Sequence, residues 1–104
     1  MSKSQLPDQV ALVAGATRGA GRGTAMALAA AGAYVYCTGR SADGHPPGMG
    51  RPETINQTVA LIEQGGGRAK AIRVDHTKEN EVATLAEEVR SEAGRLDILV
   101  NSVW

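Results

Sequence analysis

Three glycines that separate an apolar run from an alanine-rich run are the residues of this chain best suited to binding chemistry. The apolar run Val10 to Ala14 leads into Gly15, Gly19 and Gly21, with the spacing Gly-x-x-x-Gly-x-Gly. We expect a sharp turn at Gly15, a close approach of the backbone to a ligand at Gly19, and tight packing of a helix onto a sheet at Gly21. The N–H groups of the first helical turn and the positive end of the helix dipole then face a pyrophosphate. We call residues 15–21 the glycine corner and predict that it binds phosphate through Gly15, Thr17, Arg18, Gly19, Ala20 and Gly21.

Strand and helix signals alternate along the rest of the chain. Runs rich in β-forming residues predict strands over Val10 to Ala14, Ala33 to Thr38, Ala69 to Val74 and Leu96 to Asn101. Composition and helical spacing predict two helices, over Thr24 to Ala31, followed by Gly32, and over Glu53 to Gln64. A third helix is expected between a Thr77 cap and Gly94, with an apolar stripe of Val82, Leu85, Ala86 and Val89. Three prolines and three glycines predict a long loop over Ser41 to Pro52.

This order of elements predicts an α/β fold, a Rossmann-type doubly wound parallel sheet. Strands that alternate with helices are joined by right-handed crossovers, which place helices on both faces of a parallel sheet. Ligands of such sheets bind at the carboxyl ends of the strands. Gly15, the Gly39-Arg40 pair, Asp75 and Asn101 each fall at such an end. The sequence therefore predicts that they converge on one crevice.

The end of the second strand bears on the choice of cofactor. A site that prefers NAD places a carboxylate there for the ribose 2′-hydroxyl. This chain has Gly39 followed by Arg40, and a second arginine, Arg18, lies within the glycine corner. Guanidinium groups suit the 2′-phosphate of NADP(H), which is the predicted cofactor. Arg22 either assists or points to water.

Composition bounds the class of protein. The chain has 104 residues, 42% of them hydrophobic, with 11 basic residues against 11 acidic ones. These values predict one globular unit, and the balanced charge argues against nucleic acid or an anionic membrane as partner. No apolar run approaches 18 residues and no signal peptide is recognisable, so we expect a cytoplasmic protein without a membrane span. Cys37 is expected in a buried strand, and no metal site is expected.

With these residues in place, the chain resembles the short-chain dehydrogenase/reductase family over essentially its whole length. The family's first corner reads T-G-x-x-x-G-x-G, and this chain has Ala14-Gly15-Ala-Thr-Arg-Gly19-Ala-Gly21. Further matches are Asp75 after the third strand and Asp97-Ile-Leu-Val-Asn101, which resembles the D-x-L-V-N-N-A-G segment. The chain departs from the family pattern at Ala14, where a threonine is usual, and at Ser102-Val-Trp104.

The resemblance implies hydride transfer between a nicotinamide and a small carbonyl or alcohol substrate. It places Asp75 at the adenine and Asn101 at the ribose of the cofactor. His76 is then expected to contact the adenine through its backbone, with its imidazole in solvent. As a complete protein, the chain is expected to form a homo-oligomer.

The family's catalytic Ser, Tyr and Lys have no counterpart in this sequence. Its two tyrosines, Tyr34 and Tyr36, are not followed by Lys at the fourth place, so no catalytic residue is assigned. Residues 1–104 are therefore expected to be the N-terminal part of a dinucleotide-binding Rossmann domain, inactive on their own. The alternative is a non-catalytic dinucleotide-binding or interaction fragment. The arginines argue against an adenosyl-dependent methyltransferase, and the lack of Gly-Lys-Ser/Thr excludes a P-loop NTPase.

Overall fold

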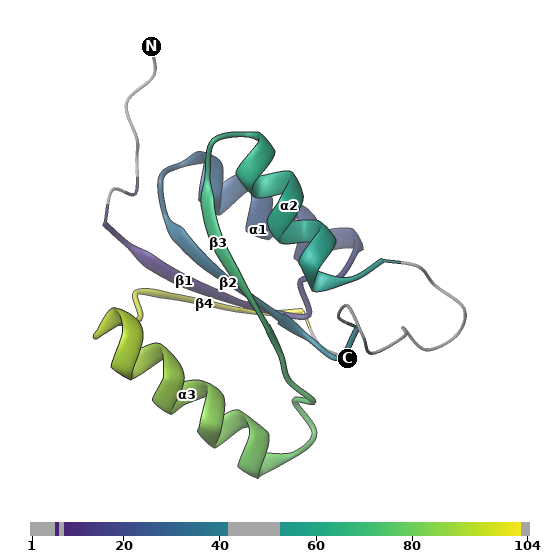
Figure 1. The fold of residues 1–104 in the computed structure, drawn as a ribbon, viewed down its shortest axis with the longest axis vertical. Helices are drawn as coiled ribbons and strands as arrows, with labels where there is room; N and C mark the ends of the chain where they lie inside the picture. The colour runs from purple at the N-terminus through teal and green to yellow at the C-terminus, as the bar shows by residue number, and fades with distance from the viewer. Residues whose placement is uncertain (1–5, 7, 42–52, 103–104) are drawn as a thin grey trace.

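A computed structural model describes residues 6, 8–41 and 53–102, and it contains one four-stranded parallel sheet with the order β3-β2-β1-β4 (Figure 1). The strands are β1 (Val10–Ala14), β2 (Tyr34–Gly39), β3 (Arg68–Arg73) and β4 (Ile98–Asn101). The helices are α1 (Gly19–Ala30), α2 (Ile55–Gln64) and α3 (Glu79–Ala93). The predicted fold class and element order are confirmed. Nearly all of the predicted loop, from residue 42 to 52, lies outside the described residues.

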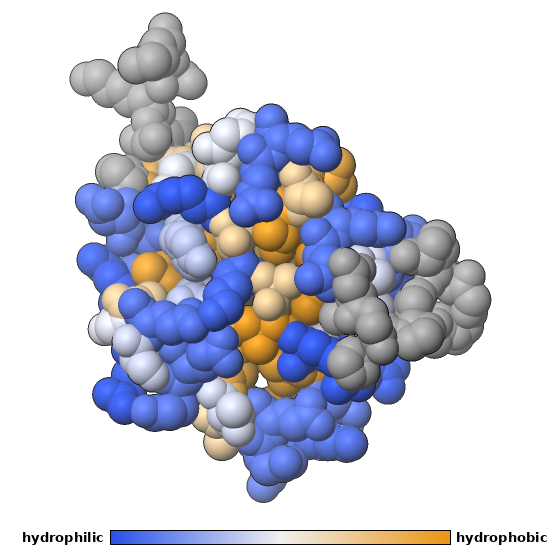
Figure 2. Space-filling model, in the orientation of Figure 1, coloured by the Kyte–Doolittle hydropathy of each residue, from blue (hydrophilic) through white to orange (hydrophobic). Residues whose placement is uncertain are grey.

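Helices cover both faces of the sheet, α1 and α2 on one face and α3 on the other (Figure 1). Along β1, Ala11 and Val13 pack towards α1 and α2, whereas Val10, Leu12 and Ala14 pack towards α3. This alternation follows from the two-residue period of a strand. Because both faces are covered, all five β1 residues are buried. Figure 2 shows the outer surface of α3 as hydrophilic, with apolar residues gathered in the band between the two helical layers.

Cys37 lies in this core, as predicted. Its side chain is fully buried in β2 among the residues that pack against α1 and α2. Burial raises the pKa of the thiol to about 12, because the thiolate would lose its hydration there. Cys37 is therefore a protonated core residue and not a nucleophile.

Small residues and glycine turns shape the helices largely as the sequence predicts. The face of α1 that meets the sheet consists of Gly21, Ala25 and Ala29, all buried. Gly32 (φ 107°) and Gly94 (φ 72°) adopt the left-handed backbone expected after α1 and α3. The structure adds a capping box at the start of α2, where the Thr54 hydroxyl accepts from the backbone N–H of Gln57.

The predicted Thr77 cap of α3 is wrong. The residue at the cap position is Lys78, which makes no side-chain cap hydrogen bond. The backbone N–H and the hydroxyl of Thr77 instead donate to Asp75 Oδ1, at 3.0 and 2.6 Å. The Asp75 carboxylate, two residues earlier, accepts from both Thr77 donors, as in an Asx turn, so the Thr77 hydroxyl does not cap the helix. Glu79 and Glu81 in the first turn of α3 compensate its dipole without a cap.

The apolar stripe predicted for α3 is buried only in part. Leu85 and Val89 are buried, whereas Val82 is 38% exposed and Ala86 is also exposed. The two buried residues pack against β1, β2 and Val74, and Leu99 of β4 remains 67% exposed. In the part of the chain described, α3 therefore covers the inner strands and leaves the neighbouring face of β4 open.

Polar side chains fix α3 to the edge of the sheet. The Tyr36 hydroxyl donates to Glu92 Oε1 at 3.0 Å, and Lys70 of β3 forms ion pairs with Glu88 and Glu92. Burial and the adjacent Glu92 carboxylate raise the pKa of Tyr36 to about 12. The phenol therefore stays protonated and serves as a structural donor.

Asp97 attaches β4 to β1. Its backbone N–H donates to the Val10 carbonyl at 2.9 Å, and its Oδ2 accepts from the Val10 N–H at 2.8 Å. The guanidinium of Arg95 binds both carboxylate oxygens, Oδ2 at 2.9 Å and Oδ1 at 2.7 Å. The Arg95 contact and the Val10 N–H lower the pKa of Asp97 below its ordinary value. This attachment sets the register that brings Asn101 beside Ala14.

We predict that Asp97→Asn destabilises the protein at pH 7 and that its effect shrinks in acid. A carboxyl with a lowered folded-state pKa stabilises above its unfolded pKa, near 3.9, and loses that contribution as the pH falls through its folded pKa. Urea unfolding at pH 7 and pH 3 measures the difference, with Glu63→Gln on α2 as the control. A difference between variant and wild type that stays constant over this range contradicts the role assigned to Asp97.

Candidate functional site

The residues predicted to form a crevice do follow strand ends at one edge of the sheet. In the parallel register Ala14 lies beside Thr38 on one side and Asn101 on the other, and Gly39 lies beside Arg73. The segments that continue from these strands begin at Gly15, Arg40, Val74 and Ser102. We call this the carboxyl edge.

The glycine corner contains the turn and the close packing expected from the sequence. Gly15 has a φ of 86° and Gly19 a φ of 57°, both in the region that favours glycine. A Cβ on Gly21 would lie 1.9 Å from the Gly15 carbonyl oxygen, so no other residue fits there. A Cβ on Gly19 would meet no atom within 4 Å. Gly21 therefore serves packing, whereas Gly19 borders open space.

Thr38 of β2 fixes the start of the glycine corner through hydrogen bonds. Its carbonyl accepts hydrogen bonds from the backbone N–H groups of Gly15 and Ala16, at 2.9 and 3.0 Å. Its hydroxyl lies 3.3 Å from the Val13 carbonyl and 2.8 Å from His76 Nε2. Since Thr38 is fully buried, these bonds fix where the corner leaves β1.

The imidazole of His76 does not lie in solvent, contrary to the prediction. It is half-buried, with Nε2 against the Thr38 hydroxyl. Burial lowers its pKa below the ordinary value, and the nearby Asp75 carboxylate opposes that shift. The ring is therefore neutral at pH 7 and supports β2. The backbone contact to an adenine stays a prediction.

The first turn of α1 presents an uncompensated positive helix end. Arg18 occupies the cap position in an extended conformation without a side-chain cap bond, and no acidic residue lies in the first turn. The first N–H groups of a helix lack partners within it. At the other helix starts, α2 has its capping box and α3 has two glutamates. Arg18, Gly19 and Ala20 are exposed, so an anion can reach this end of α1.

At the end of β2, position 39 has no room for a side chain unless Thr17 shifts. A Cβ on Gly39 would lie 2.8 Å from Thr17 Oγ1 and 3.3 Å from Ile55 Cγ2. Thr17 is buried, and its hydroxyl occupies this space. Arg40 follows with an exposed side chain, and its backbone carbonyl accepts from Arg73 Nε at 3.2 Å. The edge thus presents positive charge.

Arg73 is a further positively charged residue at the carboxyl edge, and the sequence analysis did not predict it. It ends β3 and is exposed. Its link to Arg40 depends on the pairing register of β2 with β3, for which no local sequence signal exists.

Asp75 and Asn101 lie at the same edge in different surroundings. Two hydrogen bonds from Thr77 lower the pKa of Asp75, and the positive charges of Arg40 and Lys78 act in the same direction. Asn101 is the exposed last residue of β4, and the Ser102 N–H that follows donates to the Ala14 carbonyl at 2.8 Å. Their contacts with a cofactor stay predictions.

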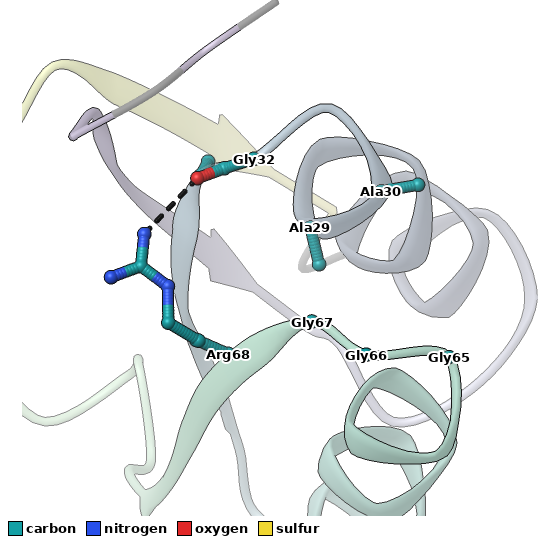
Figure 3. Close-up of a pocket in the computed structure, with 8 residues that line it drawn as sticks. Ala29, Ala30, Gly32, Gly65, Gly66, Gly67 and Arg68 are labelled. Carbon is teal, nitrogen blue, oxygen red and sulfur yellow. Dashed lines mark hydrogen bonds between the residues drawn. The ribbon is translucent and has the colours of Figure 1, made fainter. Parts of the chain in front are cut away.

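Two pockets lie at the opposite, amino-terminal edge of the sheet. One, of about 230 Å³, is lined by the turns after α1 and α2, including Gly32, residues 65–67 and Arg68, whose guanidinium donates to the Gly32 carbonyl at 3.2 Å (Figure 3). The other, of about 310 Å³, is lined by Val10, Tyr34, Tyr36 and the end of α3. Neither contains a predicted site residue.

Over the described ranges, 6, 8–41 and 53–102, no three His, Cys, Asp or Glu side chains group in a way that could hold a metal ion. None of the helices there has the length and apolarity that a bilayer crossing needs.

Comparisons with known proteins agree with this geometry. The short chain dehydrogenase family model matches residues 9–103. The Mus musculus protein "Dehydrogenase/reductase SDR family member 1" is 42% identical over 92% of this chain, which covers 28% of that protein. The crystal structure of a hydroxysteroid dehydrogenase from Escherichia coli is 37% identical with a TM-score of 0.80, over 93% of this chain and 37% of that one. A metagenomic short-chain oxidoreductase in complex with NADP is 31% identical with a TM-score of 0.80, over 92% of this chain and 39% of the other.

We predict opposite effects for alanine at two glycines of α1. Gly21→Ala forces a Cβ into the Gly15 carbonyl and should cost roughly 1–3 kcal/mol of stability. Gly23→Ala, where a Cβ meets no atom within 4 Å, should add about 0.5–1 kcal/mol through helix propensity. Chemical denaturation of both variants provides the measurement. A Gly21→Ala protein as stable as the wild type would refute the close contact.

Proposed function

The chain belongs to the short-chain dehydrogenase family, and we propose that its carboxyl edge holds the cofactor of an NADP-dependent oxidoreductase. The relatives are dehydrogenases and reductases, so the class of reaction is oxidation and reduction of a small molecule. The proposed reaction is hydride transfer between the nicotinamide and a carbonyl or alcohol. The chain spans only about a third of the length of these relatives, so the activity of the whole protein is part of the proposal.

The choice of NADP rests on the end of β2. A packed glycine and an exposed arginine lie there in place of a carboxylate. An acidic side chain at position 39 would have to displace Thr17, and the exposed Arg40 follows directly. A 2′-phosphate adds about two negative charges that a guanidinium binds through two parallel hydrogen bonds. The NADP bound to the similar metagenomic oxidoreductase supports this choice.

Each segment of the carboxyl edge has a part in holding the dinucleotide. The N-terminal turn of α1 would bind the pyrophosphate, with Gly19 leaving space for it. Arg18 and Arg40 would bind the 2′-phosphate, Asp75 and the His76 backbone would lie at the adenine, and Asn101 at the ribose. The bound nicotinamide supplies or accepts the hydride.

Neither tyrosine of the chain is placed to donate a proton to a substrate at the carboxyl edge. Tyr36 is buried and donates to Glu92, and Tyr34 starts β2 at the opposite edge of the sheet. We therefore propose that residues 1–104 form the N-terminal part of a Rossmann domain and do not reduce a carbonyl by themselves. The exposed Leu99 of β4, and the exposed Leu96 just before this strand, support this, because parallel strands are normally covered on both faces.

We predict that the protein binds NADPH about ten- to a hundredfold more tightly than NADH, since each charge-assisted contact is worth roughly 1.5–3 kcal/mol. Arg40→Leu should remove most of that preference while changing the NADH affinity little. Dissociation constants measured by fluorescence titration check this. Arg68→Leu is the control, because it removes the same charge at the opposite edge. Equal affinities of the wild type for NADPH and NADH would rule out the choice of NADP.

A second prediction concerns Gly19. Gly19→Asn should weaken binding of both dinucleotides by about tenfold or more, because its side chain would enter the space of the pyrophosphate. Asparagine tolerates a positive φ, whereas the more obvious Gly19→Val would add backbone strain at φ 57°. Gly94→Asn is the matched control, with φ 72° and open space around its Cβ but a place at the end of α3. If both variants bind alike, the phosphates lie elsewhere.

A further inference from the structure

We propose that Thr58 of α2, held by Arg22 of α1, is a positioning residue of the glycine corner. The hydroxyl of Thr58 donates to the Ala16 carbonyl at 2.7 Å and accepts from Arg22 Nε at 2.9 Å. As a determinant of nucleotide affinity, this role rests on the proposed function of the corner.

The direction of these hydrogen bonds is fixed by chemistry. A guanidinium only donates and a carbonyl only accepts, so the single hydroxyl proton of Thr58 must go to Ala16. Thr58 is fully buried, and its loss would leave the Ala16 carbonyl without this donor. Hydrogen bonds therefore run from the Arg22 guanidinium to the Thr58 hydroxyl and from there to the Ala16 carbonyl. We call this chain of hydrogen bonds the relay.

The relay fixes the peptide unit that follows Ala16, and the peptide unit that precedes Ala16 is already fixed. The Ala16 N–H donates to the Thr38 carbonyl, and the Ala16 carbonyl accepts from Thr58. Because its N–H is bound to β2 and its carbonyl to α2, the backbone at Ala16 cannot rotate without breaking a buried hydrogen bond. The direction in which the chain enters residues 17–19 is set there.

Thr58 reaches the glycine corner from a distant part of the chain. It comes from α2, 42 residues after Ala16, and binds the corner from a different element.

The guanidinium of Arg22 points towards α2 and not to water, which was one of the two possibilities that the sequence left open. Its terminal nitrogen donates to the Thr54 carbonyl at 3.2 Å and to Gln57 Oε1 at 3.3 Å, the two residues of the capping box. Arg22 thus joins α1 to the start of α2 and holds Thr58 in place.

The start of α2 also contacts the segment that follows β2. The Ile55 N–H donates to the Ser41 carbonyl at 2.8 Å, next to Arg40, and the Ile55 side chain packs against Gly39. A displaced α2 start would move both predicted phosphate-binding segments. Loss of the relay should therefore weaken the binding of both NADPH and NADH, whereas the loss of Arg40 should weaken the binding of NADPH and change that of NADH little.

The first test compares Thr58→Val, which removes the hydroxyl at nearly constant shape, with Thr58→Ser, which keeps it. Thr58→Val should raise the dissociation constants for NADPH and NADH by about tenfold, and Thr58→Ser should stay near the wild type. Ile62→Val, a buried truncation on the same helix, controls for lost stability. Arg22→Met replaces Thr58→Val if the latter does not fold. Unchanged affinity in both Thr58→Val and Arg22→Met would overturn the proposal.

A second readout needs no nucleotide and separates this proposal from the proposed function. Amide hydrogen exchange of Gly15 and Ala16 should become faster in Thr58→Val, relative to the amides of β1, and stay unchanged in Ile62→Val. If the wild type binds neither dinucleotide, the proposed function fails and the exchange result alone decides the positioning role. Equal acceleration in Thr58→Val and Ile62→Val would show that Thr58 acts only through stability.

Discussion

The contact between Gly21 and the Gly15 carbonyl is the constraint on which the carboxyl edge depends. A Cβ at position 21 would lie 1.9 Å from that oxygen, so α1 can start directly above the end of β1 only because this residue is glycine. The short connection places the N-terminal end of α1 at the carboxyl edge. A longer connection would separate the positive end of α1 from Arg40, which follows β2, and from Asn101, which ends β4.

Three other elements support this contact. The Thr38 carbonyl of β2 binds two N–H groups of the corner, Thr58 of α2 binds its Ala16 carbonyl, and Asp97 aligns β4 with β1. The chain carries no net charge, so its capacity for anions depends on local placement. Arg18, Arg40 and Arg73 lie at the carboxyl edge, whereas Glu88 and Glu92 of α3 are paired with Lys70. Neutral composition is thus compatible with an anion site.

The sequence predicted those features that depend on neighbouring residues. Strand and helix periods, the turn at Gly15 and the packing at Gly21 follow from local sterics, so element order and fold class could be read directly. Contacts between distant residues could not, because no local pattern encodes them. His76 reaches Thr38 across 38 residues, and Arg22 reaches Thr58 across 36. The Thr77 cap was wrong for a local reason, since Asp75 offers a competing acceptor two residues away.

Mapping the binding of NADP⁺ onto the backbone amides of the protein tests whether the carboxyl edge holds a dinucleotide. In a titration followed by ¹⁵N-resolved NMR, we expect saturable shifts at Gly19, Ala20 and Arg40, with little change at Gly66 and Arg68 in the pocket of the opposite edge. Shifts confined to that opposite pocket, or no shifts at millimolar NADP⁺, would contradict a dinucleotide site at the carboxyl edge.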